Sequence, residues 1–191
     1  MVRIKKMAAI LLAAGLALSA AACGKGQQDS AAQEGNAAGY KDDVAVADIQ
    51  AAVAQKLGDN YWPDMDVPAE LLEDTYGIKE EMYEEILAQT PMISANVDTL
   101  VIVKAKEGSE KQVEDALLAY KEYNTTQALQ YPMNLGKVQA AQVAVYGRYV
   151  CFVQLGAETP ESDEDRDGAA IKHCEQENAK ALEAIEEILT K

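Results

Sequence analysis

The sequence predicts an α+β domain in which N-terminal helices precede a strand–helix–β-hairpin–helix unit, with a small, mostly antiparallel sheet packed by helices. Residues 100–105 form a continuous apolar run rich in Val and Ile, which is typical of a strand covered on both faces. Residues 142–146 and 149–155 flank Gly147-Arg148, and a glycine first in a two-residue loop suits a type II′ hairpin turn. Apolar residues at helical spacing before and after these runs predict helices.

Helices are predicted for most of the region before the first strand. The first covers 46–57 and stops at Gly58, since its apolar residues recur at helical spacing: Val46, Ile49, Val53 and Leu57. A short helix opened by a proline is predicted for 68–76. A further helix is predicted for 79–90 from the spacing of its apolar residues: Met82, Ile86 and Leu87.

A helix, a hairpin and a long final helix are predicted after the first strand. Ser109 is expected to cap the helix that follows it, with Gln112 at capping-box spacing, and Pro132 to close that segment. The hairpin register places two pairs on the predicted core face, Val145 with Val150 and Val143 with Phe152, and two on the other, Tyr146 with Tyr149 and Ala144 with Cys151. The final helix, from about Ala169, carries an apolar stripe interrupted by Asn178: Ile171, Cys174, Ala181, Leu182, Ile185 and Leu189.

The first residues predict an export signal. Basic residues at positions 3, 5 and 6 precede the apolar run 7–18 and the small residues 19–22, and these are the three parts of a secretory signal peptide. The apolar run is shorter than a transmembrane helix, which needs about 20 residues. Residues 1–22 are therefore predicted to be a lipoprotein or secretory signal that is removed.

The residue that follows the small-residue site is Cys23, and here the segment resembles a bacterial lipoprotein signal. The resemblance implies that Cys23 carries a lipid and holds the protein on the outer face of the bacterial cytoplasmic membrane. Ordinary cleavage after Ala22, which would release a soluble secreted protein, is the alternative. Residues 23–43 are predicted to be the lipidated cysteine and a flexible tether, because 24–39 are mostly small and polar, and residues 44–191 a single domain.

The charge of the chain excludes one class of partner. The sequence has 17 basic and 32 acidic residues, a net charge of −15. The signal holds three of the basic residues, so 14 basic against 32 acidic residues leave −18 on the mature chain. Such a surface repels phosphate backbones and anionic lipid headgroups, so nucleic acid is not expected as a partner, and contact with the membrane is expected through the lipid anchor.

The sharpest candidate metal site is the acidic run 163–168. Asp163, Asp165 and Asp167 alternate before Gly168, as in the first half of a calcium loop, where carboxylate oxygens converge and glycine permits the turn. The twelfth position of such a loop is Cys174 in place of a bidentate Glu. A solvated acidic loop before the final helix is the alternative, since carboxylates are favourable near a helix N-terminus. Apart from calcium, no cofactor is predicted.

Cys151 and Cys174 are a candidate disulfide, which an extracellular location permits. Two small buried hydrophobic residues are the alternative. A thiol nucleophile is not predicted, because the single histidine, His173, is adjacent to Cys174 on a helix and points elsewhere. The sequence also lacks a nucleophile elbow, a zinc-ligand spacing and a phosphate-binding glycine loop. A hydrolase that uses carboxylates on envelope polymers is the alternative to a non-enzymatic protein.

Four aromatic side chains are candidates for a ligand platform: Tyr61, Trp62, Tyr146 and Tyr149. Exposed aromatic residues serve this purpose at many binding surfaces. Large aromatic residues are more often mostly buried, and a cross-strand aromatic pair commonly stabilises a hairpin. All four are therefore predicted to pack within the domain.

Several short segments together resemble a family of clostridial lipoproteins that carry a domain of unknown function, the DUF4358-like lipoproteins. The segments are Asn96-Val97-Asp98, the apolar strand after it, Lys104-Ala105-Lys106, the next helix and the hairpin Tyr146-Gly147-Arg148-Tyr149-Val150. The resemblance implies a surface lipoprotein and no particular chemistry. The sequence therefore predicts a non-enzymatic domain that binds an envelope protein or a small ligand outside the cell.

Overall fold

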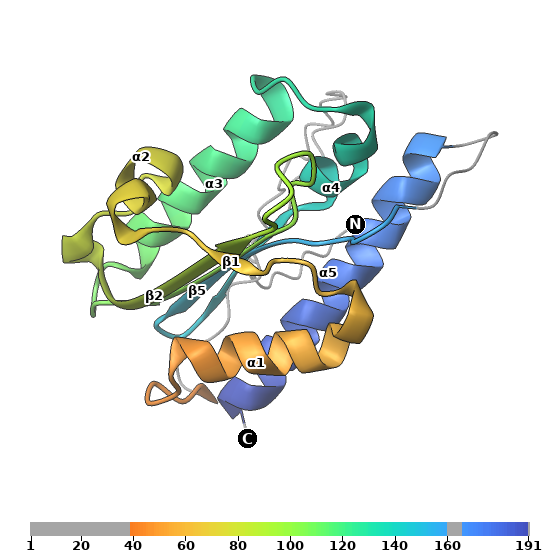
Figure 1. The fold of residues 1–191 in the computed structure, drawn as a ribbon. Helices are drawn as coiled ribbons and strands as arrows, with labels where there is room; N and C mark the ends of the chain where they lie inside the picture. Colours follow the sequence, from red (N-terminus) through yellow and green to blue (C-terminus); the bar gives the residue numbers. More distant parts are fainter. Residues whose placement is uncertain (1–38, 160–165, 191) are drawn as a thin grey trace, which may run out of the picture.

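A computed structural model describes residues 39–159 and 166–190 of the chain. Its helices and strands follow in the order α1 (Val46–Leu57), β1 (Met65–Asp66), α2 (Leu72–Tyr76), β2 (Tyr83–Thr90), β3 (Thr99–Ala105), α3 (Glu110–Thr126), α4 (Leu135–Ala140), β4 (Gln142–Tyr146), β5 (Tyr149–Gln154) and α5 (Arg166–Thr190). Short 3₁₀ turns lie at 58–60, 69–71, 80–82 and 132–134. The α+β fold class predicted from the sequence is confirmed (Figure 1).

The five strands form one antiparallel sheet in the order β1-β2-β3-β5-β4. The β4–β5 hairpin has the predicted register, with Val145 opposite Val150 and Tyr146 opposite Tyr149. Gly147 has φ +60° while Arg148 has no positive φ, as a type II′ turn requires. The central strand β3 is buried on both faces, as its apolar run predicts.

Helices cover both faces of the sheet, so the domain has three layers (Figure 1). On one face α1 and α5 pack against alternate strand residues such as Leu100, Ile102 and Cys151. On the other face α2 and α3 pack against the intervening residues, among them Val101 and Phe152. The hairpin face that carries Tyr146, Tyr149, Ala144 and Cys151 is therefore a second core, and the prediction of a single core face was incomplete.

The helix predicted for 79–90 is wrong. Only Glu80–Met82 form a helical turn, and Tyr83–Thr90 form strand β2, in which Ile86 is opposite Val103 of β3. Adjacent apolar residues fit a strand here because the sheet is covered on both faces. Leu87 packs into the core beneath α1 and α5, while Ile86 packs into the core beneath α2 and α3.

Two details of the α3 region also differ from the expectation. Ser109 precedes α3, but its side chain makes no capping hydrogen bond to any described residue, and Gln112 donates its backbone N–H to the Ser109 carbonyl instead. The backbone of Ser109 is already helical, so its side chain is not placed as in a capping box. The short helix α4, after Pro132, was not predicted.

The chain enters the domain at the hairpin-turn end of the sheet. The Tyr40 ring stacks edge-on against Tyr146 at 5.4 Å, and the Lys41 N–H donates to the Leu189 carbonyl near the end of α5. Tyr40 and Lys41 thus pack against the domain. Within residues 39–159 and 166–190, no helix has the length and apolar character needed to span a bilayer.

Candidate functional site

A buried ion pair lies at the end of the sheet opposite the hairpin turn. Lys137 Nζ is 2.6 Å from Asp98 Oδ1, and the two side chains are 4% and 0% exposed. Asp98 directly precedes β3, and Lys137 projects from α4. Buried charges need both an opposite charge and hydrogen bonds to offset the loss of hydration. We therefore take this ion pair as the starting point for the site.

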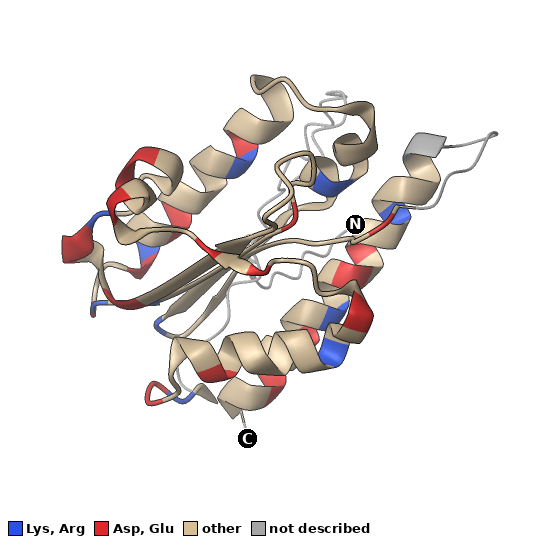
Figure 2. Ribbon diagram, in the orientation of Figure 1, with Lys and Arg blue, Asp and Glu red and all other residues tan. Residues whose placement is uncertain are grey.

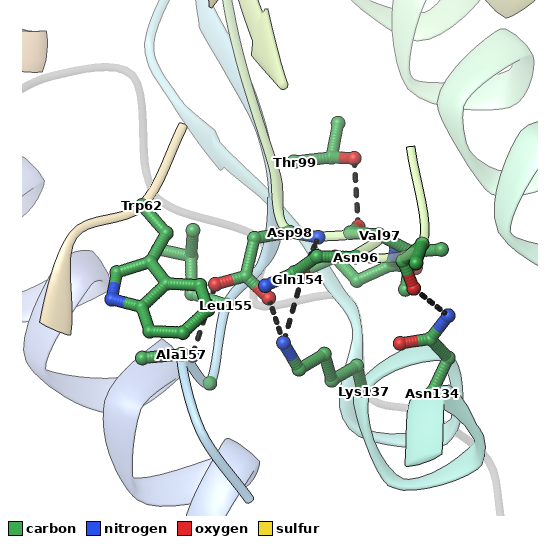
Figure 3. Close-up of polar contacts among 12 residues, drawn as sticks. Trp62, Asn96, Val97, Asp98, Thr99, Asn134, Lys137, Gln154, Leu155 and Ala157 are labelled. Atoms are coloured by element: carbon green, nitrogen blue, oxygen red, sulfur yellow. Dashed lines mark hydrogen bonds and ion pairs between the residues drawn. The ribbon is translucent and has the colours of Figure 1, made fainter. Parts of the chain in front are cut away.

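Two loops are tied to this ion pair by amide side chains (Figure 3). Lys137 Nζ donates to Asn96 Oδ1 at 2.9 Å, and the same oxygen accepts the Asp98 backbone N–H at 2.8 Å. Asn134, before α4, donates to the Ala95 carbonyl at 2.9 Å. These bonds hold the β2–β3 loop, residues 91–98, against the segment that leads into α4.

The chain after β5 closes the site from the other side. The Ala157 N–H donates to Asp98 Oδ2 at 2.9 Å, and Ala157 is the one non-glycine residue with positive φ (+43°) in the described segments. Gly156 is required by close packing, because an added Cβ would lie 2.6 Å from Cys174 Sγ. The Asp98 carboxylate thus fixes a strained turn against the start of β3.

The electrostatics of Asp98 combine two opposing effects. Burial raises the pKa of the Asp98 carboxyl above its ordinary value, and the nearby Lys137 ammonium and the N–H groups of Ala157 and Gly156 counteract part of that rise. Gln154 adds to the polar cluster by donating to the Val97 carbonyl at 2.5 Å. Its other amide atom, Oε1, is buried and has no hydrogen-bond partner among the described residues.

Above this polar cluster the two loops expose apolar side chains to solvent. We define the apolar loop surface by its large residues and their exposed fractions: Met92 71%, Ile93 67%, Leu129 101%, Tyr131 63%, Met133 55% and Leu135 37%. These are six of the nine large hydrophobic residues that are exposed in the described segments, so exposure of this kind is concentrated here. Residues 91–97 and 127–136 contain no charged residue, in a chain of which 26% is charged. Figure 2 shows Lys, Arg, Asp and Glu along the helices and on parts of the strands.

The residues that the sequence singled out for lipidation and for calcium binding lie outside the described part of the chain. Cys23, Asp163 and Asp165 lie outside the described residues, as does the side chain of Asp167, so lipidation and the calcium loop stay predictions. Within the described segments, no group of three His, Cys, Asp or Glu side chains is placed to hold a metal ion.

The two cysteines are buried, and the histidine contacts a backbone carbonyl. Cys151 and Cys174 are both buried and free, so the candidate disulfide is not formed in the described part of the chain. Burial raises the pKa of the Cys151 thiol to about 12 and that of Cys174 to about 11. His173 Nε2 lies 3.0 Å from the Gly156 carbonyl oxygen. The alternative of two buried hydrophobic residues therefore describes both cysteines better.

Three of the aromatic candidates, Tyr61, Tyr146 and Tyr149, pack in the core beneath α1 and α5 as predicted, whereas Trp62 is half-buried and belongs to neither core. Tyr149 is fully buried and donates its hydroxyl to the Val44 carbonyl at 2.6 Å, and Tyr146 packs in the same core. The Tyr61 hydroxyl donates to Gln89 Oε1 at 2.6 Å, and burial raises the pKa of Tyr61 to about 12. Trp62 donates to the Asp59 carbonyl, and its ring centroid lies 5.8 Å from Lys137 Nζ, so it forms one side of the ion-pair site.

The reasoning from sequence missed Asp98 and Lys137 as site residues. Lys137 carried a visible signal, because it is the only charged residue between positions 123 and 147. A lone charge in such a stretch, between Gly136 and Val138, points to a buried and partnered side chain. Asp98 stands immediately before a strand that is buried on both faces, where a carboxylate also requires a partner.

The fold and the site define a three-layer α+β domain that has a buried ion pair beneath an uncharged, apolar loop surface. The family model for a domain of unknown function (DUF4358) matches residues 56–155, and the chain belongs to this family. The matched region contains the whole sheet together with Asp98 and Lys137, whereas α5 lies beyond it. No curated protein and no solved structure matches the chain.

Proposed function

We propose that this protein is a surface lipoprotein of the clostridial type, anchored through Cys23 to the outer face of the cytoplasmic membrane, whose domain binds a protein partner without catalysis. The basic start, the short apolar run and the small residues before Cys23 support the anchor. The apolar loop surface is the observation that carries the binding function. The two loops that carry these residues are joined by the hydrogen bond from Asn134 to the Ala95 carbonyl, and apolar residues gathered on neighbouring exposed loops mark interaction sites, whereas single ones need no explanation.

The composition of the apolar loop surface favours a protein as partner. The centres of protein–protein interfaces are depleted in charged residues and enriched in Tyr and Met. The surface has this composition, with Tyr131, Met92 and Met133 among its exposed residues. Methionine side chains also adapt their shape to a partner.

Charge at the edge of the surface specifies the partner further. Asp64 accepts the Met92 backbone N–H at 2.7 Å, and Asp66 accepts a hydrogen bond from Gln89 on the neighbouring strand. Both carboxylates are exposed, and the chain as a whole carries −15. The partner that fits has an apolar centre bordered by Lys or Arg, because matched charges at the rim steer association and align the two surfaces.

The position of the surface suits a protein anchored at its N-terminus. The chain enters beside Tyr146 and Gly147, at the turn of the hairpin, and the surface lies beyond the other end of strands β3 and β5. Six residues of β5 separate the two ends, roughly 17 Å at about 3.3 Å per residue. An anchored domain would therefore present the surface away from the point where the tether joins it.

The polar groups near the surface favour binding over catalysis. The thiols of Cys151 and Cys174 are held protonated at neutral pH by their raised pKa values, and His173 is engaged with a backbone carbonyl. Asp98 and Lys137 form an ion pair, Asp98 also accepts the Ala157 N–H, and Lys137 also donates to Asn96 Oδ1. Such an arrangement supports the two loops in a fixed geometry, which lowers the entropic cost of binding.

The anchor is tested by metabolic labelling of whole cells with a palmitate analogue. The wild-type chain is expected to incorporate label and to fractionate with membranes, while Cys23→Ala loses both properties. Release of the unlabelled wild-type chain into the medium would contradict the anchor and support ordinary signal cleavage.

The binding surface is tested by photocrosslinking in intact cells. A photoreactive amino acid is placed at Met133, within the apolar loop surface, and in a matched variant at Leu71, which is 46% exposed outside it. A crosslinked protein is expected from position 133 and not from position 71, and it should disappear when Met92→Asp is added to the first variant. Equal capture from both positions, or none from position 133, would remove the proposed surface.

A further inference from the structure

An amine, a carboxamide and a carboxyl group lie together in one cluster, supplied by Lys137, Asn96 and Asp98. An ion pair needs only the amine and the carboxyl group, so the carboxamide of Asn96 is an additional reactive group. Lys137 Nζ is 2.9 Å from Asn96 Oδ1 and 2.6 Å from Asp98 Oδ1. The Asn96 carbonyl carbon is one bond of about 1.23 Å from that oxygen, so Nζ lies within about 4.1 Å of it. Reactions between bound groups proceed from separations of about 3–3.5 Å, which a small rotation of the Asn96 amide would reach.

We propose that Lys137 and Asn96 become joined by an intramolecular isopeptide bond between Nζ and the side-chain carbonyl carbon of Asn96, with Asp98 as the group that moves the proton. The proposal concerns a covalent modification inside the domain and is independent of the binding function above. Asn96 and Asp98 lie on the β2–β3 loop, and Lys137 lies on α4 (Figure 3).

The balance of the reaction requires no oxidant and no further reactant. Asp98 takes one proton from the Lys137 ammonium, and the neutral amine forms the Nζ–C bond while the carbonyl electrons move onto Oδ1 of Asn96. A second Nζ proton passes to the amide nitrogen, the C–Nδ2 bond breaks, and ammonia leaves. The ammonia takes the proton from Asp98 and departs as ammonium, which restores the carboxylate.

Each step has a group in place to assist it. The Asp98 backbone N–H, 2.8 Å from Asn96 Oδ1, would hold the negative charge that develops on this oxygen. Both side chains are buried, and Lys137 Nζ lies 2.6 Å from Asp98 Oδ1, close enough for a proton to pass directly between them. Burial raises the pKa of the Asp98 carboxyl above its ordinary value, a shift in the direction that a proton acceptor needs.

The location would give the bond a mechanical consequence. It would join the loop that carries Met92 and Ile93 to α4, which begins at Leu135 shortly after Met133. The same two segments are already held together by the Asn134 hydrogen bond to the Ala95 carbonyl. A covalent link between residues 96 and 137 would keep the two loops together even when the domain unfolds.

Mass spectrometry of the full chain, denatured and digested with trypsin, tests the bond directly. The wild-type chain is expected to resist cleavage after Lys137 and to yield a branched peptide, in which 80–104 is joined to 122–148, that is lighter by one ammonia than the two peptides together. Lys137→Arg and Asn96→Ala are expected to give unbranched peptides of their sequence masses, while Lys172→Arg, an exposed change on α5, keeps the branched peptide.

The result is decisive on the wild-type chain itself, so a variant that fails to fold does not affect it. Wild-type peptides of unmodified mass, with complete cleavage after Lys137, would overturn the proposal. A branched peptide that has lost water and is joined at residue 98 would equally overturn it, because Asp98 would then be the acyl group rather than the proton carrier.

Discussion

Asn178 on α5 offers a sharp test of how the long final helix is held against the sheet. It interrupts the apolar stripe of α5 and is fully buried. Its Oδ1 accepts the Leu155 N–H at 2.9 Å and its Nδ2 donates to the Ala140 carbonyl at 2.8 Å. One side chain therefore satisfies two buried backbone groups, at the end of β5 and at the end of α4.

The substitution Asn178→Leu removes both hydrogen bonds while keeping a side chain of similar size. Each buried backbone group left without a partner costs about 1–3 kcal/mol, and the added apolar contacts return part of that. We expect the free energy of unfolding to fall by about 3 kcal/mol, which is a large part of the ~5–15 kcal/mol typical of a domain.

Urea unfolding followed by circular dichroism measures this change. The matched control is Gln176→Leu, the same chemical change at an exposed position on the same helix, and it should alter the free energy of unfolding by less than about 0.5 kcal/mol. Equal midpoints for the two variants would refute the assignment of Asn178 as the link between α5, α4 and β5.

Three further outcomes follow from the structure. Arg148 forms a two-point contact with Glu84 and lowers the pKa of this carboxyl below its ordinary 4.5. This pair stabilises the fold above pH 4.5, so Arg148→Ala should unfold more easily than wild type at pH 7, and the gap should close as acid titration passes through the lowered pKa. Cys151 and Cys174 should resist iodoacetamide at pH 8 until urea unfolds the domain, and a reductant should leave the mass unchanged; alkylation of the native protein would contradict their burial. Leu129→Asp should leave the thermal midpoint unchanged, because Leu129 is fully exposed, and a large drop would show that it packs within the domain.

The elements that sequence reasoning predicted well are those specified by local chemistry. The register of the hairpin follows from a two-residue loop that begins with glycine, so every pair from Val143 to Val150 could be assigned. Helix α1 has one apolar stripe and a glycine stop, and both are observed. Strand β3 is apolar on both faces, which identifies a central strand.

The predictions from sequence failed where contacts between distant parts of the chain determine the structure. Ile86 and Leu87 are compatible with a helix by spacing, and only the presence of two cores, one on each face of the sheet, explains why both are inward in a strand. The ion pair joins Asp98 to Lys137, which lie 39 positions apart, and no periodic pattern links them. The apolar loop surface combines two loops that the order of strands brings to one end of the sheet, so the sequence alone could not assemble it.

The central claim, that the apolar loop surface binds a protein, is tested most directly by the affinity of purified chains for the partner captured at position 133. Burying one Met side chain contributes about 1.5–3 kcal/mol, so we expect Met92→Asp combined with Met133→Asp to weaken binding by about 100-fold or more. Leu71→Asp, a change at an exposed apolar residue outside the surface, should bind like wild type. Wild-type affinity for the double variant would contradict the claim.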